Sequence, residues 1–147
     1  MSIEIRKAET GDYAAVYSLI SEFALFIRTP EKVTITEKQM LEDKDLFSCL
    51  VAIKDSAIVG FASYFFAYYS WTGKALYLDD LYVQENSRGQ GIGNKLFDEV
   101  FKIAKETKCR KLKWQVSKWN QAAINFYKSK GAVIDDVEIN CDLVLQD

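Results

Sequence analysis

The loop Arg88-Gly89-Gln90-Gly91-Ile92-Gly93 is the part of this sequence whose residue types and spacing point most directly to chemistry. It follows a strand-like run, Leu76 to Val83, and precedes apolar residues at helical spacing: Ile92, Leu96, Val100, Ile103 and Ala104. The loop therefore leads into a helix N-terminus, where unpaired amides and the helix dipole attract anions. Because glycine has no side chain, a pyrophosphate can approach the main chain. We expect a phosphorylated cofactor here; the alternative is a strand-to-helix turn without a ligand.

The spacing of the loop excludes two other glycine-rich phosphate sites. A Walker A loop ends in Gly-Lys-Ser/Thr, whereas Gly93 is followed by Asn94 and Lys95, so no hydroxyl is placed for magnesium. A dinucleotide fingerprint needs a glycine at position 94 and usually lies in a leading βαβ unit. This loop comes after more than half of the chain.

The sequence contains no histidine, which removes the most common general base and metal ligand. Carboxylates, tyrosine or lysine must therefore carry any proton transfer. Cys49, Cys109 and Cys141 are widely separated in apolar surroundings, so we expect buried thiols rather than disulfides or a zinc site. No metal is expected.

Length and charge limit the class of protein. With 147 residues, the chain is predicted to form a single domain over residues 1–147. The net charge of −2 gives no general attraction to nucleic acid, and a cationic small substrate fits better. The charged N-terminus is unlike a signal sequence, so we expect a cytoplasmic protein. The uncharged stretch Ser56 to Gly73 is rich in aromatic residues, which favours a strand over a membrane span.

Periodicity and turn signals predict an α/β chain that begins with a strand and two helices. The elements expected before the glycine loop are a strand Ile3–Lys7, a helix after Thr10-Gly11-Asp12, a short helix from Thr36 to Glu42, and strands Phe47–Lys54, Ala57–Tyr69 and Lys74–Val83. Thr36 and Gln39 are spaced as a capping box for the short helix, and Asp55-Ser56 is expected to form a hairpin turn between the second and third strands. The elements expected after it are a long helix to about Lys108, a strand Lys111–Val116, a helix Asn120–Lys130 stopped by Gly131, and one or two closing strands within Val133–Leu145.

Three blocks of sequence carry a resemblance to a known family. They are Tyr68–Lys74 leading into Tyr77–Val83, the loop Arg88-x-x-Gly91-x-Gly93, and Trp119–Lys128. In this order and spacing they resemble the GCN5-related N-acetyltransferases (GNAT), and within them the diamine (spermidine/spermine) N-acetyltransferase branch. The resemblance implies a central, mixed, mostly antiparallel twisted sheet with helices on both faces. It also implies acetyl transfer from acetyl-CoA directly to a primary amine in a ternary complex, by a homodimer.

The resemblance assigns catalytic roles to two residues. Tyr127 matches the family tyrosine that protonates the leaving thiolate, and Asn120, Ile124 and Tyr127 fall on one helical stripe. Asp79 stands where the branch usually has glutamate, the base that removes a proton from the substrate ammonium through water. The alternatives are a core tyrosine and a pair of solvated carboxylates.

Asp79 and Asp80 point to opposite faces of a regular strand, so only one meets the acetyl group unless a bulge intervenes. Such a bulge, common in the family, splays this strand to seat the cofactor and frees an amide near Leu81. Trp71, Asp79 and Asp80 are the expected substrate contacts, whereas Ile27 and Tyr69 replace two acidic residues of the polyamine enzymes. Spermidine is therefore a doubtful substrate. The alternative substrates are a smaller amine, an amino-acid side chain or a protein N-terminus.

The remaining expectation concerns the cofactor. The residues expected to contact acetyl-CoA are Leu81, Tyr82, Val83, Arg88, Gly89, Gln90, Gly91, Ile92, Gly93, Asn94, Lys95, Asn120, Tyr127, Lys128 and Lys130. The lysines among them are candidates for the CoA phosphates as point charges. Two rival functions stay open, a regulatory acyl-CoA-binding module without turnover and an interaction domain with an empty loop.

Overall fold

The computed structural model describes residues 2–145. They separate into two compact units, one ending at Gln115 and the other beginning at Val116. The first unit contains a five-stranded sheet and three α-helices, and the second contains one helix followed by an irregular segment.

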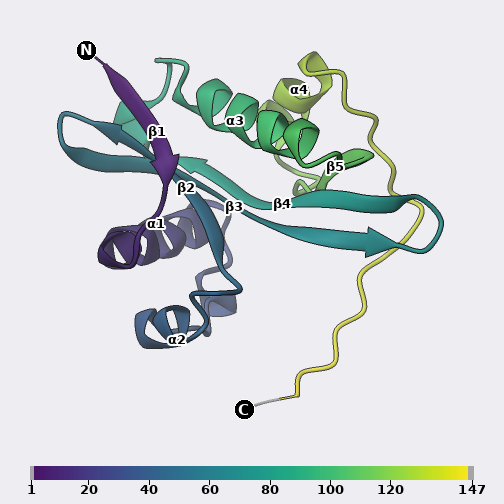
Figure 1. Cartoon of the computed structure of the whole chain (residues 1–147), viewed down its shortest axis with the longest axis horizontal. Helices are drawn as coiled ribbons and strands as arrows, with labels where there is room; N and C mark the ends of the chain where they lie inside the picture. The colour runs from purple at the N-terminus through teal and green to yellow at the C-terminus, as the bar shows by residue number, and fades with distance from the viewer. Residues whose placement is uncertain (1, 146–147) are drawn as a thin grey trace. The chain divides into compact units, whose positions relative to one another are not determined.

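The sheet of the first unit is mixed and mostly antiparallel, as predicted (Figure 1). Its strands lie in chain order: β1 (Ile3–Lys7), β2 (Ser48–Lys54), β3 (Ala57–Tyr69), β4 (Gly73–Val83) and β5 (Lys111–Trp114). The first three pairings are antiparallel and the β4–β5 pairing is parallel. Asp55 and Ser56 join β2 to β3 with positive φ angles of 51° and 65°, which suits the right-handed twist of a two-residue hairpin.

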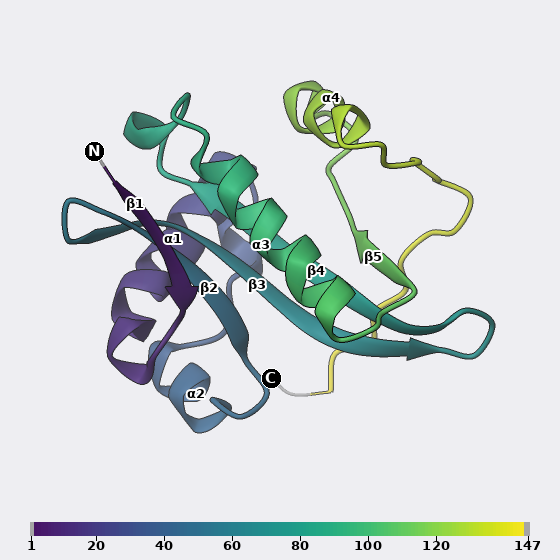
Figure 2. The same ribbon diagram turned by 45° about the horizontal axis from the view of Figure 1, so that its top comes forward.

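Helices cover both faces of this sheet, again as predicted (Figure 2). Helices α1 (Tyr13–Phe26) and α2 (Glu37–Glu42) lie on one face, where their apolar side chains pack with Val51 and Phe61. Helix α3 (Ile92–Glu106) lies across the other face. Its buried stripe is Ile92, Leu96, Phe97, Val100 and Ala104, close to the periodicity read from the sequence. The expected capping box of α2 is present, with Thr36 and Gln39 exchanging hydrogen bonds.

The second unit confirms one helix and contradicts the predicted closing strands. Helix α4 (Gln121–Ser129) is followed by Gly131 at φ +91°, the expected left-handed stop. Residues 132–145 form no strand. Val137, Ile139 and Leu143 alternate as in a strand but are 80%, 85% and 86% exposed. Alternation shows which side chains share a face, whereas a strand also needs a hydrogen-bonded neighbour, and none pairs with this segment among the described residues.

Of two other expectations, one is correct only in part and the other is confirmed. Cys49 is buried, but Cys109 is half-buried and Cys141 exposed, so the expectation of three buried thiols is correct for Cys49 alone. All three are free thiols. No helix within residues 2–145 is long and apolar enough to cross a membrane, and most of the Ser56–Gly73 stretch forms β3.

Candidate active site

A β-bulge in β4 places Asp79 and Asp80 on the same face of the sheet. Ser63 of β3 pairs with Asp80, and the next residue, Tyr64, pairs with Leu78, so Asp79 is the extra residue. Leu78 and Leu81 both pack on the α3 face. The two residues between them therefore both point to the α1 face, because side chains alternate from each end of the bulge. The bulge expected from the resemblance is present, and it brings together two carboxylates that regular pleating would separate.

The sheet opens at the same bulge. β5 pairs with β4 from Ala75 to Leu78, where Leu78 faces Trp114, and the ladder ends there. In the described sheet, β4 from Asp79 to Val83 thus has β3 as its only strand neighbour. Every second N–H and C=O of this segment faces the opening without a strand partner. A main chain of this kind can bind an extended amide-containing ligand by strand-like hydrogen bonds.

The local environment raises the pKa of both carboxyl groups. Asp79 is exposed, yet displacement of water by the surrounding protein raises its pKa. Asp80 is half-buried, and its burial, together with the charge of Asp79, raises its pKa to about 7. A carboxyl group with this pKa can accept and release a proton near neutral pH, which a general base requires.

The glycine loop has the geometry of an anion site. Gly89 and Gly91 have φ angles of +80° and +78°, which favour glycine, and Gly91 is the N-cap of α3. The first intrahelical bond of the loop runs from the Lys95 amide to the Gly91 carbonyl at 3.0 Å, so the amides before it have no acceptor in the helix. A Cβ atom at Gly89 or Gly91 would meet open space. These features fit a phosphate at the helix N-terminus.

Arg88 anchors this loop to β4. Its Nε donates to the Val83 carbonyl at 2.9 Å, and its guanidinium lies 4.5 Å from the ring centroid of Phe26 and 5.4 Å from that of Tyr82. These contacts fix where the loop leaves the strand. Arg88 thus has a structural role besides its predicted contact with the cofactor.

The side chains of residues 81–83 point away from the opening. Tyr82 is buried on the α1 face, where its hydroxyl donates to the Glu22 carboxylate, and burial raises its pKa to about 12. Leu81 and Val83 pack on the α3 face. These three predicted cofactor contacts are therefore possible only through the main chain.

Glu22 belongs to a pocket that the sequence did not indicate. This pocket, of about 720 Å³, lies between α1 and the end of β4 and is lined by Glu22, Leu25, Phe26, Tyr82, Gln84, Glu85, Asn86 and Arg88. No motif in the sequence pairs Glu22 with Tyr82, which are sixty residues apart.

The second unit holds the remaining predicted residues, all on or next to α4. The Asn120 side-chain oxygen accepts from the Ala123 amide at 3.2 Å and caps the helix, so Asn120 stands before the helix rather than on its stripe. Tyr127 is half-buried, with its ring centroid 5.4 Å from that of Phe126. Lys128 and Lys130 are exposed.

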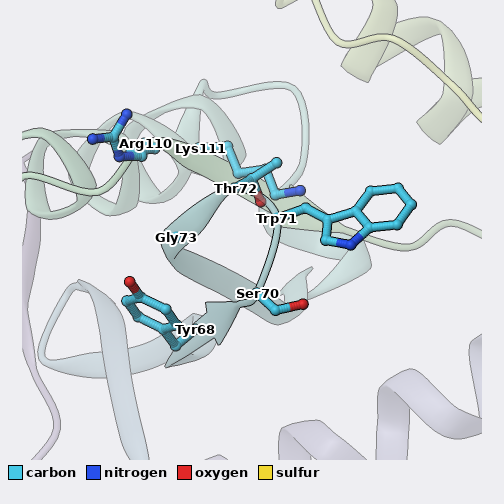
Figure 3. A pocket seen from close by; sticks show the side chains of 7 residues that line it. All are labelled: Tyr68, Ser70, Trp71, Thr72, Gly73, Arg110 and Lys111. Atoms are coloured by element: carbon cyan, nitrogen blue, oxygen red, sulfur yellow. The ribbon is translucent and has the colours of Figure 1, made fainter.

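Trp71 lies far from Asp79 within one chain. It is 96% exposed at the tip of the β3–β4 hairpin, and Figure 3 shows its indole pointing away from Tyr68 and Arg110. It lines a pocket of about 590 Å³ with Tyr68, Ser70, Thr72, Gly73, Arg110 and Lys111. Asp79 is six positions along the strand from Gly73, a rise of about 20 Å. A single chain does not bring these two predicted substrate contacts together.

The geometry of the first unit defines a class of protein. An opened strand, a carboxylate pair beside it and an anion-binding helix N-terminus are the parts needed to hold a phosphorylated acyl carrier and accept a proton from an amine. The class is that of acyltransferases using a carrier of the coenzyme A type.

Comparison with known proteins identifies the family. Residues 13–132 match the acetyltransferase (GNAT) family. The chain is 35% identical over 143 residues to the thialysine N-epsilon-acetyltransferase of Sus scrofa, covering 89% of this chain and 84% of that protein. It is 40% identical over 141 residues to the human spermidine/spermine N(1)-acetyltransferase-like protein 1, covering 88% of this chain but only 20% of that protein. The chain belongs to the GNAT family and is an acetyl-CoA-dependent N-acetyltransferase of the diamine acetyltransferase branch.

Solved structures support the same fold. The ribosomal-protein-alanine N-acetyltransferase of Brucella melitensis biovar Abortus 2308 superposes with a TM-score of 0.79 at 22% identity, covering 97% of this chain and all of that one. At this identity the likeness concerns the fold alone. It agrees with the predicted α/β GNAT architecture.

Proposed function

We propose that this enzyme transfers the acetyl group directly to a small primary amine in a ternary complex. The observation that carries this proposal is the opening of the sheet at Asp79, where β4 loses β5 as a neighbour and a carboxylate pair lies beside the exposed main chain. Acetyl-CoA lies along this segment, with its pyrophosphate at the amides of Gly91 to Asn94. The family match spans residues 13–132, parts of both units, which supports a single functional domain over the whole chain.

The reaction needs two proton transfers. The ammonium gives one proton to Asp79, and the neutral nitrogen attacks the thioester carbon. As the tetrahedral intermediate collapses, the C–S bond breaks and the thiolate takes a proton from Tyr127, which recovers one from the nitrogen. The products are the N-acetylated amine, CoA thiol and one proton released to water. No covalent acetyl-enzyme is formed, so the three cysteines have no part.

The substrate we propose is an amine with a second polar or cationic group, smaller than a polyamine. The pig relative is named for thialysine, a lysine analogue, and the human relative for spermidine and spermine. In this chain the ammonium groups of Lys111 and Lys113 lie 4.7 and 4.9 Å from the ring centroid of Tyr69. These two cations would repel a distal ammonium bound beside Tyr69, which disfavours spermidine at that position.

We also propose a cytoplasmic homodimer. Trp71 is almost fully exposed and about 20 Å along the strand from its own Asp79, so it can contribute to an amine site only in a partner subunit. Sedimentation equilibrium tests this, with Trp71→Ala expected to raise KM for the amine. A monomeric enzyme with full activity would contradict it.

Initial-velocity kinetics test the ternary mechanism. With both substrates varied, intersecting reciprocal plots are expected, and parallel plots would indicate a covalent intermediate instead. A melting temperature measured with and without acetyl-CoA should rise with the cofactor. Stabilisation by acetyl-CoA without turnover of any amine would favour a regulatory binding module.

A further inference from the structure

The two aspartates of the bulge differ in their access to the opening. Asp79 is the extra residue of the bulge and is exposed, whereas Asp80 is half-buried. Asp80 continues a cross-strand row on the α1 face, since it pairs with Ser63 and Ser63 pairs with Cys49. Ser63 is 5% exposed, so Asp80 lies opposite a buried residue, whereas Asp79 has no directly opposite residue on β3.

Neither carboxylate has a basic partner among residues 2–145. Two ion pairs of the sheet unit, Arg6 with Asp12 and Lys38 with Glu42, involve neither residue of the bulge. The effects that raise the pKa of Asp80 are burial and the charge of Asp79, with no cation to oppose them. Two adjacent carboxylates in this setting resist double ionisation and titrate as a coupled pair.

The neighbouring titratable groups do not change this balance. Cys49 has a pKa raised to about 12 by burial and stays a thiol, and burial also raises the pKa of Tyr77. From α1, Tyr13 stays a neutral phenol, because burial raises its pKa, and Glu22 accepts a hydrogen bond from Tyr82. Arg88 stacks over Tyr82 and Phe26.

From this placement, and resting on the proposed amine acetylation, we propose that Asp80 is the terminal proton acceptor of the reaction. Asp79 holds the substrate ammonium at the opening, and the proton lost by the nitrogen passes from Asp79 to Asp80. The nitrogen keeps its lone pair and forms the new C–N bond. Asp80 returns the proton to water when the acetylated amine leaves, so it can accept a proton again in the next turnover.

The different roles of Asp79 and Asp80 follow from the chemistry of their two carboxyl groups. An exposed carboxylate attracts a cation but is a weak base, because its pKa lies far below that of an ammonium. A carboxylate held among buried neighbours is a stronger base. The bulge supplies both properties at adjacent positions by placing Asp79 and Asp80 on one face.

The coupling is tested without cofactor or amine. Protein labelled with ¹³C at the aspartate carboxyl carbons is titrated by NMR as wild type, Asp79→Asn and Asp80→Asn, with Asp45→Asn as an exposed matched control. We expect one carboxyl, absent in Asp80→Asn, to titrate near neutral pH. Its midpoint should fall by more than about 1 pH unit in Asp79→Asn and stay unchanged in Asp45→Asn. A midpoint independent of Asp79, or an ordinary value for Asp80, would overturn the pair.

The relay is tested by pH–rate profiles on whichever amine is turned over. In Asp80→Asn the acid limb of kcat/KM should move to lower pH by more than about 1 unit, because Asp79 alone then sets it. The plateau of kcat should fall by about tenfold or more, because a weaker base remains. A purely structural role would lower the rate without moving the limb, and this outcome would overturn the relay. If the NMR midpoints are coupled but no amine is acetylated, the proposed function fails and the relay with it.

Discussion

Removing the charge of Asp80 should make the protein more stable at alkaline pH. Burial, together with the charge of Asp79, raises the pKa of Asp80 from 3.8 to about 7, a difference of about 3 pH units, and each unit corresponds to about 1.4 kcal/mol. Because the folded-state pKa is above the unfolded one, the free energy of unfolding falls as pH rises through this interval. Ionised Asp80 should therefore cost up to about 4 kcal/mol at pH above about 8.

The assay is urea unfolding of wild type and Asp80→Asn at several pH values. Groups that do not interact with residue 80 cancel in the difference, so the curve of ΔΔG against pH reports Asp80 together with its coupled neighbour Asp79. It should be flat at acid pH, rise by about 1.4 kcal/mol per unit between the two pKa values, and level off above neutrality. Asp45→Asn, which changes an exposed carboxylate, should show no such rise. A flat difference curve for Asp80→Asn would refute a raised pKa and the burial argument behind it.

Three further predictions concern the cofactor loop, the acid and the core. Gly91→Asp should abolish acetyl-CoA binding, measured by calorimetry, because it adds a negative charge and a side chain at φ +78°. The control Gly11→Asp also adds its side chain in open space and should leave binding unchanged. Unchanged affinity in Gly91→Asp would place the cofactor site elsewhere. Tyr127→Phe should keep its affinity for the cofactor and lose about a hundred- to ten-thousand-fold in kcat. If this variant turned over as fast as wild type, Tyr127 would have only a packing role. Leu96→Ala, at a fully buried position of α3, should lower the free energy of unfolding by about 2–5 kcal/mol, and a loss below about 1 kcal/mol would contradict its place in the core.

The elements with strong local signals could be predicted from the sequence. The apolar stripe of α3, the Thr36–Gln39 capping box and the Asp55-Ser56 hairpin each depend on neighbouring residues, and the structure confirms all three. The glycine loop is also local, because its function needs only a strand end, positive φ angles and a helix start.

Features that depend on partners distant in sequence could not be predicted in this way. The bulge was expected only from the resemblance, and its position at Asp79 is set by the register of β3 against β4. The hydrogen bond from Tyr82 to Glu22 joins separate elements, so the inward direction of Tyr82 was missed. The alternation of residues 133–145 predicted strands, but it carries no information on whether a neighbouring edge pairs with them.

Turnover on a panel of amines tests the central claim most directly. Small diamines, lysine analogues, spermidine, spermine and short peptides are each incubated with enzyme and acetyl-CoA, and both free thiol and acetylated amine are measured. We predict equal amounts of thiol and acetylated product, with small amines bearing a second polar group favoured over spermidine and spermine. Preference for spermidine by a wide margin would contradict the proposed substrate class. Thiol release that does not depend on any amine would contradict direct acetyl transfer.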